Sequence, residues 1–168
     1  RVELNSSLIG APLKDTLIKI TGINDIDIIN KLEISFKNFY DTEGFKKTKL
    51  YLGVEKIIKE LYAKKIVLFI ITNKRILPTN KILSLLNLNF FFEGVYSQDF
   101  FSPSIKQKSL VISEVIKTHK LDYQSSFYIG DRVEDGIAAN KNKINFIYAS
   151  WGYGAEDDFN LLPNFETV

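Results

Sequence analysis

Apolar residues recur along most of the chain with the spacing of alternating helices and strands. Between Gly53 and Lys65 they fall every three or four residues, which predicts a helix with one buried face. The uninterrupted apolar run Ile66–Ile71 follows, and it predicts a strand covered on both faces, as in parallel sheets. Further helices are predicted from Pro78 to Asn87, over 106–120 and over 133–142, and further strands over 94–97, 126–129 and 145–149. This alternation predicts an α/β fold of three layers with a mainly parallel sheet.

The same spacing predicts which side chains of three helices face the core. They are Val54, Ile57, Ile58, Leu61 and Tyr62 in the first helix, Ile82, Leu85 and Leu86 in the second, and Leu110, Val111, Val115 and Ile116 in the third. These apolar faces are expected to cover the sheet.

The first fifty residues have a different pattern. Residues 12–21 and 27–40 predict two amphipathic helices with no strand between them, and the second is expected to bury Ile28, Leu32, Phe36 and Phe39. We therefore assign residues 1–49 to a partial helical cap, with 41–50 as the return linker, and residues 50–168 to the α/β core.

Composition narrows the classes of function. The 168 residues suffice for one principal domain, and the share of hydrophobic residues (45%) and charged residues (25%) is that of a folded protein. No apolar run approaches the roughly 20 residues that cross a bilayer, so we expect a cytoplasmic protein with no membrane partner. The net charge of +2 is spread over scattered lysines, which argues against nucleic-acid binding. Since cysteine is absent, a metal would bind through oxygen or through the single His119, which we expect in the last turn of a helix.

Polar groups follow two of the predicted strands, where ligands bind in open parallel sheets. Thr72 and Asn73 follow the first strand and could hold an anion, although such a pair is more often turn chemistry. Asp131 follows Gly130 at the end of a later strand, with Glu134 and Asp135 soon after. These carboxylates suit Mg²⁺, and the alternative is that Asp131 caps the next helix while the other acids favour its positive end.

Two lysines begin the helix that precedes this second strand. Lys106 or Lys108 could neutralise a phosphoryl group and the carboxylates around it, although most lysines at such positions are simply solvated. The order of a hydroxyl, a lysine and a Gly-Asp pair at successive strand ends favours a shared site.

That order resembles the haloacid dehalogenase-like (HAD) hydrolase superfamily. Ile70–Lys74 resembles the second motif of the family, Lys108 the lysine of the third, and Tyr128–Gly136 the fourth, which is the most specific of the three. Leu52–Glu55 and Trp151–Gly154 are similar to the phosphoglycolate-phosphatase branch. The resemblance covers most of the chain, from about residue 10 to residue 155, and implies a Rossmann-like core.

The resemblance also implies a chemistry. It would be a Mg²⁺-dependent phosphatase that hydrolyses a small phosphomonoester, such as phosphoglycolate, through an aspartyl-phosphate. Thr72 and the backbone amide of Asn73 would bind the phosphoryl group, and Lys108 would contact both the phosphate and the nucleophile. Asp131 would ligate Mg²⁺, with Asp135 as a second ligand or as the support of metal-bound water. Lys108 fits better than Lys106 in its distance from Gly130-Asp131 and in the apolar pattern after it.

The first motif of the family, a strand followed by the nucleophile in Asp-x-Asp-Gly-Thr, is absent from this sequence. Asp25-Ile26-Asp27 is the only Asp-x-Asp, and it is interpreted as the start of a helix. In the family the missing strand lies between the strands that end at Thr72 and Asp131, and unpaired buried backbone groups cost about 1 to 3 kcal/mol each. We therefore expect an N-terminal segment of about forty to sixty residues outside this sequence, which starts at Arg1 and contains no methionine. The 168 residues alone would be inactive.

Two other classes are considered. A catalytically inactive HAD-like domain could bind a phosphorylated ligand or a protein partner, and the missing nucleophile favours it. A response-regulator-like receiver should have an acidic pair after its first strand, and this chain has none there. Substrate and oligomeric state stay open.

Overall fold

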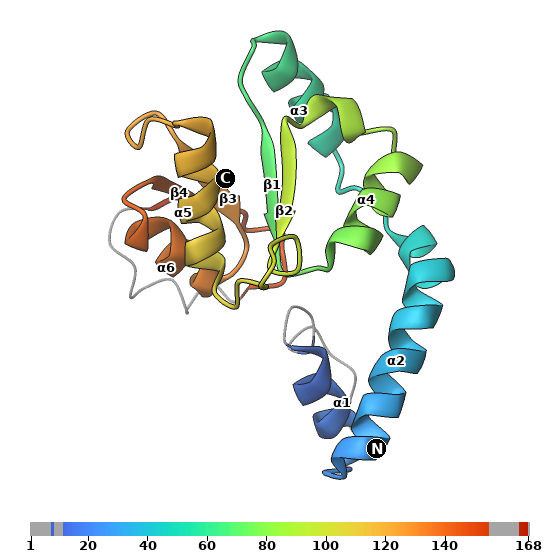
Figure 1. Ribbon diagram of the computed structural model, residues 1–168. Coiled ribbons are helices and arrows are strands. Elements are labelled where there is room, and N and C mark those ends of the chain that lie inside the picture. The colour runs from blue at the N-terminus through green and yellow to red at the C-terminus, as the bar shows by residue number, and fades with distance from the viewer. Residues whose placement is uncertain (1–7, 9–11, 155–164, 168) are drawn as a thin grey trace. The chain divides into compact units, whose positions relative to one another are not determined.

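The computed structural model describes residue 8, residues 12–154 and residues 165–167, and from α3 to β4 its helices and strands alternate (Figure 1). The helices are α1 (Leu13–Thr21), α2 (Ile26–Thr42), α3 (Val54–Ala63), α4 (Ile76–Leu85), α5 (Lys108–His119) and α6 (Val133–Lys141), and the 3-10 turns include η2 (Gly44–Lys47) and η3 (Asn89–Phe91). The strands are β1 (Phe69–Thr72), β2 (Gly94–Ser97), β3 (Phe127–Gly130), β4 (Asn145–Tyr148) and β5 (Phe165–Thr167). The α/β fold expected from the sequence is confirmed, and β5 is an addition to it. No helix of the described residues is long and apolar enough to cross a bilayer.

The described strands form two sheets. One pairs β1 with β2, and the other has the order β3-β4-β5. Phe127 lies opposite Asn145 and Phe146 opposite Phe165, and both pairings in this second sheet are parallel. The expectation of parallel strands is confirmed there.

The chain divides into two compact units. The first comprises residues 1–70 and 74–95. In it α1 packs against α2, and Leu83, Leu88 and Phe91 form a buried cluster with partly buried neighbours that include Ile58. The division into a cap over residues 1–49 and a core over residues 50–168 stays a prediction.

The second unit comprises residues 71–73 and 96–168. Its helix α6 packs against β3 and β4, and α5 packs against α6. The buried cluster consists of Ile112, Ile116, Ala138, Ala139, Ile144, Phe146 and Tyr148, and Ile71 packs against it. Every residue that the sequence assigned to chemistry therefore falls within this unit.

Some apolar faces are less buried than the sequence predicted. Ile66 and Val67 are exposed and precede β1, so the apolar run is not a strand covered on both faces. In the helices, Ile57, Tyr62, Leu85 and Leu110 are exposed, and Ile112 is buried in α5 instead. Periodicity identifies residues that share a face, but the rest of the chain decides whether anything covers that face.

Helix α2 shows the same limit. Ile28, Phe36 and Phe39, which were expected to be inward, are exposed, while the buried residue of this helix is Ile29. The prediction of its apolar face is wrong for these three side chains. The helix also extends through Asp41 and Thr42, which were expected in the return linker.

The start of α2 confirms the interpretation of Asp25-Ile26-Asp27 as helix chemistry. Oδ1 of Asp25 accepts hydrogen bonds from the backbone amides of Asp27 and Ile28 at 2.9 Å and 3.1 Å. These amides have no carbonyl partner within the helix, so the carboxylate satisfies them as an N-cap.

Replacing Asp25 with Ala should therefore lower the free energy of unfolding by about 1 kcal/mol, because two amides at the helix start lose their acceptor. Asp25→Asn keeps a side-chain oxygen at the cap, so its free energy of unfolding should stay within about a few tenths of a kcal/mol of the wild-type value. Urea unfolding of both variants measures the difference. Equal losses in the two would contradict a capping role.

Candidate active site

The turn from β3 into α6 brings several carboxylates together. Asp131 directly follows β3, and Glu134 and Asp135 lie in the first turn of α6. Asp135 is 4% exposed, whereas Glu134 is exposed to solvent. The backbone amide of Arg132 donates to Oδ2 of Asp135 at 3.3 Å, so Asp135 caps the helix, and the capping role considered for Asp131 is not observed.

Lys108 provides the positive charge for this turn. It is the first residue of α5, and its Nζ contacts Oδ1 of Asp135. Both side chains are largely buried, which strengthens the attraction between them and makes the loss of either partner costly. Lys106 is exposed, and the structure brings Lys108 rather than Lys106 to the acids.

Two glycines after β4 let the chain pass close to Asp131. A Cβ on Gly152 would overlap the Asp131 side chain, and one on Gly154 would overlap the Asp131 carbonyl oxygen. Between them, the amide of Tyr153 donates to Oδ2 of Asp131 at 2.7 Å. The Trp151–Gly154 run therefore orients Asp131, a function that the sequence signalled only through two glycines spaced two apart.

A third glycine, Gly130, is required for the same reason. Its added Cβ would lie 2.5 Å from Oδ2 of Asp135. The absence of a side chain at the end of β3 thus lets Asp135 fold back over the strand end.

Thr72 is the last residue of β1 and Asn73 comes directly after it, so both lie at the strand end where the sequence predicted them. Oδ1 of Asn73 accepts a hydrogen bond from Gln98 at 3.3 Å. The hydroxyl of Tyr128, in β3, donates to the carbonyl of Ile71 at 3.1 Å. Tyr128 thereby links the strand that leads to Asp131 with the residue before Thr72, and sequence reasoning gave it no such role.

The hydroxyl of Tyr128 keeps its proton. Burial raises the pKa of Tyr128 well above its usual value, and the negative charges of Asp135 and Asp131 raise this pKa further. The link to Ile71 is therefore a permanent donor contact at ordinary pH.

The carboxylates at this turn suit a Mg²⁺ site with one protein ligand better than a site closed by several protein ligands. Among the described residues no three His, Asp or Glu side chains gather as a metal site. Oδ2 of Asp131 is held by Tyr153, and its Oδ1 accepts no hydrogen bond from residues 12–154, while both oxygens of Asp135 are engaged. Mg²⁺ commonly takes one or two carboxylates and completes its shell with water and phosphate.

His119 lies at the last position of α5, as expected, and its Nε2 contacts the Tyr96 hydroxyl at 2.7 Å.

Comparison with known proteins identifies the family. The sequence model of the haloacid dehalogenase-like hydrolase family matches residues 3–149 of this chain. The chain belongs to the haloacid dehalogenase-like hydrolase family. It resembles the phosphoglycolate phosphatase of Vibrio cholerae, with 27% identity over 77% of this chain and 58% of the relative. It also resembles that of Photobacterium profundum, with 26% identity over 87% of this chain and 63% of the relative.

The fold is that of the HAD family as well. A haloacid dehalogenase-like hydrolase from Streptococcus pneumoniae superposes with a TM-score of 0.82 at 24% identity, over 96% of this chain and 74% of the other. The chain spans 58% and 63% of the lengths of the two phosphatases that it matches. Its likeness to the phosphoglycolate-phosphatase branch of the HAD family agrees with the resemblance found in its motifs.

The Tyr128 link generates a test with a defined pH dependence. Tyr128→Phe removes the hydrogen bond to Ile71 and should lower stability by about 1 kcal/mol near neutral pH. Since the pKa of Tyr128 is raised on folding, the unfolded chain releases this proton first, so the stabilisation is fully present below about pH 10 and is lost progressively as pH rises above that value. Urea unfolding should therefore show that the difference in free energy of unfolding between the wild type and Tyr128→Phe is smaller at pH 10.5 than at pH 8.

The exposed Tyr123 offers a matched control. Tyr123→Phe should leave stability nearly unchanged at both pH values, because this side chain is half in solvent. A gap for Tyr128→Phe that stays constant with pH would contradict a buried, proton-donating Tyr128.

Proposed function

We propose that this chain forms the main part of a HAD phosphatase that hydrolyses a small phosphomonoester with Mg²⁺. The observation that carries the proposal is the pairing of Lys108 with the buried Asp135 beside Asp131, at the carboxyl end of a parallel strand. This is where an open α/β sheet binds ligands. A lysine paired with one carboxylate, with a second carboxylate in the same turn, suits a phosphoryl group that approaches together with a cation.

Each residue has a distinct task in this proposal. The Thr72 hydroxyl and the Asn73 backbone amide bind the phosphoryl oxygens, and Lys108 neutralises their charge. Asp131 offers Oδ1 to Mg²⁺, which supplies charge stabilisation to the transferring phosphoryl group. Asp135 keeps Lys108 in place and supports the water around the cation.

The nucleophile would be an aspartate outside these 168 residues, forming an aspartyl-phosphate. Asp25 and Asp27 are unsuited to that role, because Asp25 caps α2 and the element directly before the pair is the helix α1. Phosphoglycolate is the substrate proposed, from the names of the two relatives and the motifs of that branch. The cytoplasmic location expected from the sequence stays a prediction.

An inactive binding domain is the second candidate, and the use of Asp25 in a helix cap favours it. Such a domain would hold inorganic phosphate and Mg²⁺ at the same residues without turning over a phosphomonoester. Phosphate binding without phosphate release therefore separates the two candidates.

The test is phosphate release from a panel of small phosphomonoesters that includes phosphoglycolate, with Mg²⁺ and with EDTA. The full-length natural protein should require Mg²⁺, and Asp131→Asn should reduce kcat by about a hundredfold or more, because the cation loses a charged ligand. Release of phosphate independent of Mg²⁺ would refute the proposal.

Glu134→Gln is the matched control for this experiment. Glu134 lies in the same turn but is exposed and contacts Arg132 at 3.5 Å. Its substitution removes one negative charge near Asp131 and should change kcat by less than about twofold. Equal losses in the two variants would indicate a general electrostatic effect rather than a ligand at Asp131.

A further inference from the structure

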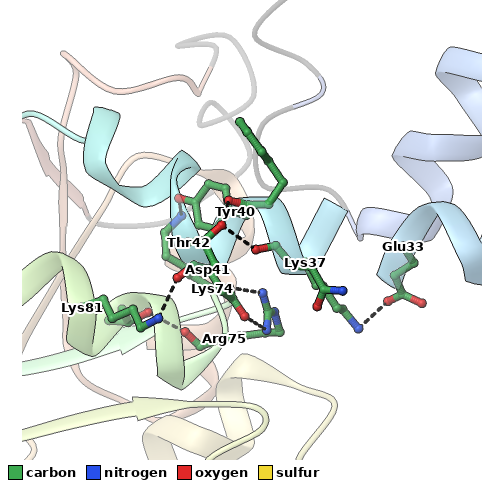
Figure 2. A network of polar contacts seen from close by, with 11 residues as sticks. Glu33, Lys37, Tyr40, Asp41, Thr42, Lys74, Arg75 and Lys81 are labelled. Carbon is green, nitrogen blue, oxygen red and sulfur yellow. Dashed lines mark hydrogen bonds and ion pairs between the residues drawn. The ribbon is translucent and has the colours of Figure 1, made fainter. Parts of the chain in front are cut away.

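Within the first unit, an ion pair joins the end of α2 to the start of α4. Both terminal nitrogens of Arg75 donate to Asp41, with Nη1 at 2.9 Å from Oδ2 and Nη2 at 2.5 Å from Oδ1 (Figure 2). The Asp41 side chain is 16% exposed and that of Arg75 31%. A two-point contact of this kind fixes the plane of the guanidinium as well as its charge.

Two lysines hold the same end of α2. Nζ of Lys81 donates to the backbone carbonyl of Asp41 at 2.6 Å, and Nζ of Lys74 donates to the Tyr40 hydroxyl at 2.7 Å. Figure 2 shows Lys74, Arg75 and Lys81 converging on Tyr40 and Asp41. The side chain and the carbonyl of Asp41 are thus both engaged by α4 and the residue before it.

The backbone of Arg75 is held from the other side. The amide and the hydroxyl of Thr79 both donate to the Arg75 carbonyl, at 3.2 Å and 2.8 Å. Arg75 occupies the N-cap position of α4, so its side chain is fixed by α2 and its carbonyl by α4. Arg75 therefore has little conformational freedom.

Arg75 lies only three residues after Thr72 and two after Asn73. Each residue extends a chain by at most about 3.6 Å, so a fixed Arg75 limits where these two residues can go. Only Lys74 separates Arg75 from Asn73 along the chain.

We propose that Asp41 is a positioning residue: by holding Arg75, it keeps the Thr72–Lys74 segment in the conformation that binds phosphate. The inference rests on the proposed function of Thr72 and Asn73. It assigns to α2 a part in phosphate binding that requires no contact between Asp41 and the phosphate.

Glu33 provides a matched control on the same helix. Its side chain is 18% exposed, close to the value for Asp41, and it pairs with Lys37 at 2.8 Å and with Lys14 at 3.6 Å. The hydrogen bond from Lys37 lowers the pKa of Glu33, so this group is a carboxylate at neutral pH. Its ion-pair partners lie in α1 and α2, so Glu33→Gln removes the same charge without disturbing Arg75.

The experiment compares Asp41→Asn, Asp41→Glu and Glu33→Gln in the full-length natural protein. Hydrogen exchange of the backbone amides of residues 72–77 and 79 reports on the segment, since Pro78 has no amide hydrogen, and titration with inorganic phosphate in the presence of Mg²⁺ reports on phosphate affinity. Asp41→Asn should raise exchange over 72–79 and weaken phosphate binding by about tenfold, since a small displacement of a binding group is costly. Asp41→Glu should restore most of both, and Glu33→Gln should match the wild type.

Exchange in α3 serves as the internal reference, because general destabilisation would raise it as well. A rise over 72–79 with unchanged exchange in α3, together with weaker phosphate binding, supports the proposal. Unchanged exchange in Asp41→Asn, an equal change in Glu33→Gln, or faster exchange with unchanged phosphate affinity would each overturn it. If the wild type binds no phosphate, the proposed function itself fails, and the positioning role falls with it.

Discussion

The burial of Asp135 beside Lys108 constrains how α5, α6 and β3 meet in the second unit. A carboxylate withdrawn from water costs several kcal/mol unless a cation and hydrogen-bond donors replace its solvent. Lys108 and the amide of Arg132 do so here, which requires the first turns of α5 and α6 to meet at the end of β3. Gly130 is needed at that point because a side chain would occupy the space of the carboxylate. One electrostatic requirement thus determines the positions of three elements.

This requirement also separates the roles of the two aspartates. With Asp135 committed to Lys108 and the helix start, Asp131 is the one of these two aspartates with an oxygen that accepts no hydrogen bond from residues 12–154. The close passage of Gly152 and Gly154 lets the amide of Tyr153 fix its orientation. The proposed metal chemistry therefore depends on a segment that follows the strand-end acids by about twenty residues in the sequence.

The sequence predicted elements well because helical and strand periodicity is local. Residues 133–142 and 145–149 were expected as a helix and a strand, and α6 and β4 are found there. Burial was predicted less well, as Leu110 shows, because distant segments decide what covers a face. The contact of Lys108 with Asp135 spans 27 residues and that of Tyr128 with Ile71 spans 57, so neither leaves a local pattern. The order of Thr72, Lys108 and Asp131 along the chain could be found in the sequence without knowledge of these two contacts.

Asp131, Asp135 and Lys108 are proposed to form one site for a divalent cation and phosphate. Its most direct test is paramagnetic broadening of backbone amide signals by Mn²⁺, a substitute for Mg²⁺, with inorganic phosphate present. The amide signals of residues 130–132 and 152–154 should broaden first, at a small fraction of one equivalent of Mn²⁺, and Asp131→Asn should abolish this selectivity. Broadening centred on other acidic residues, or the same pattern in Asp131→Asn, would contradict it.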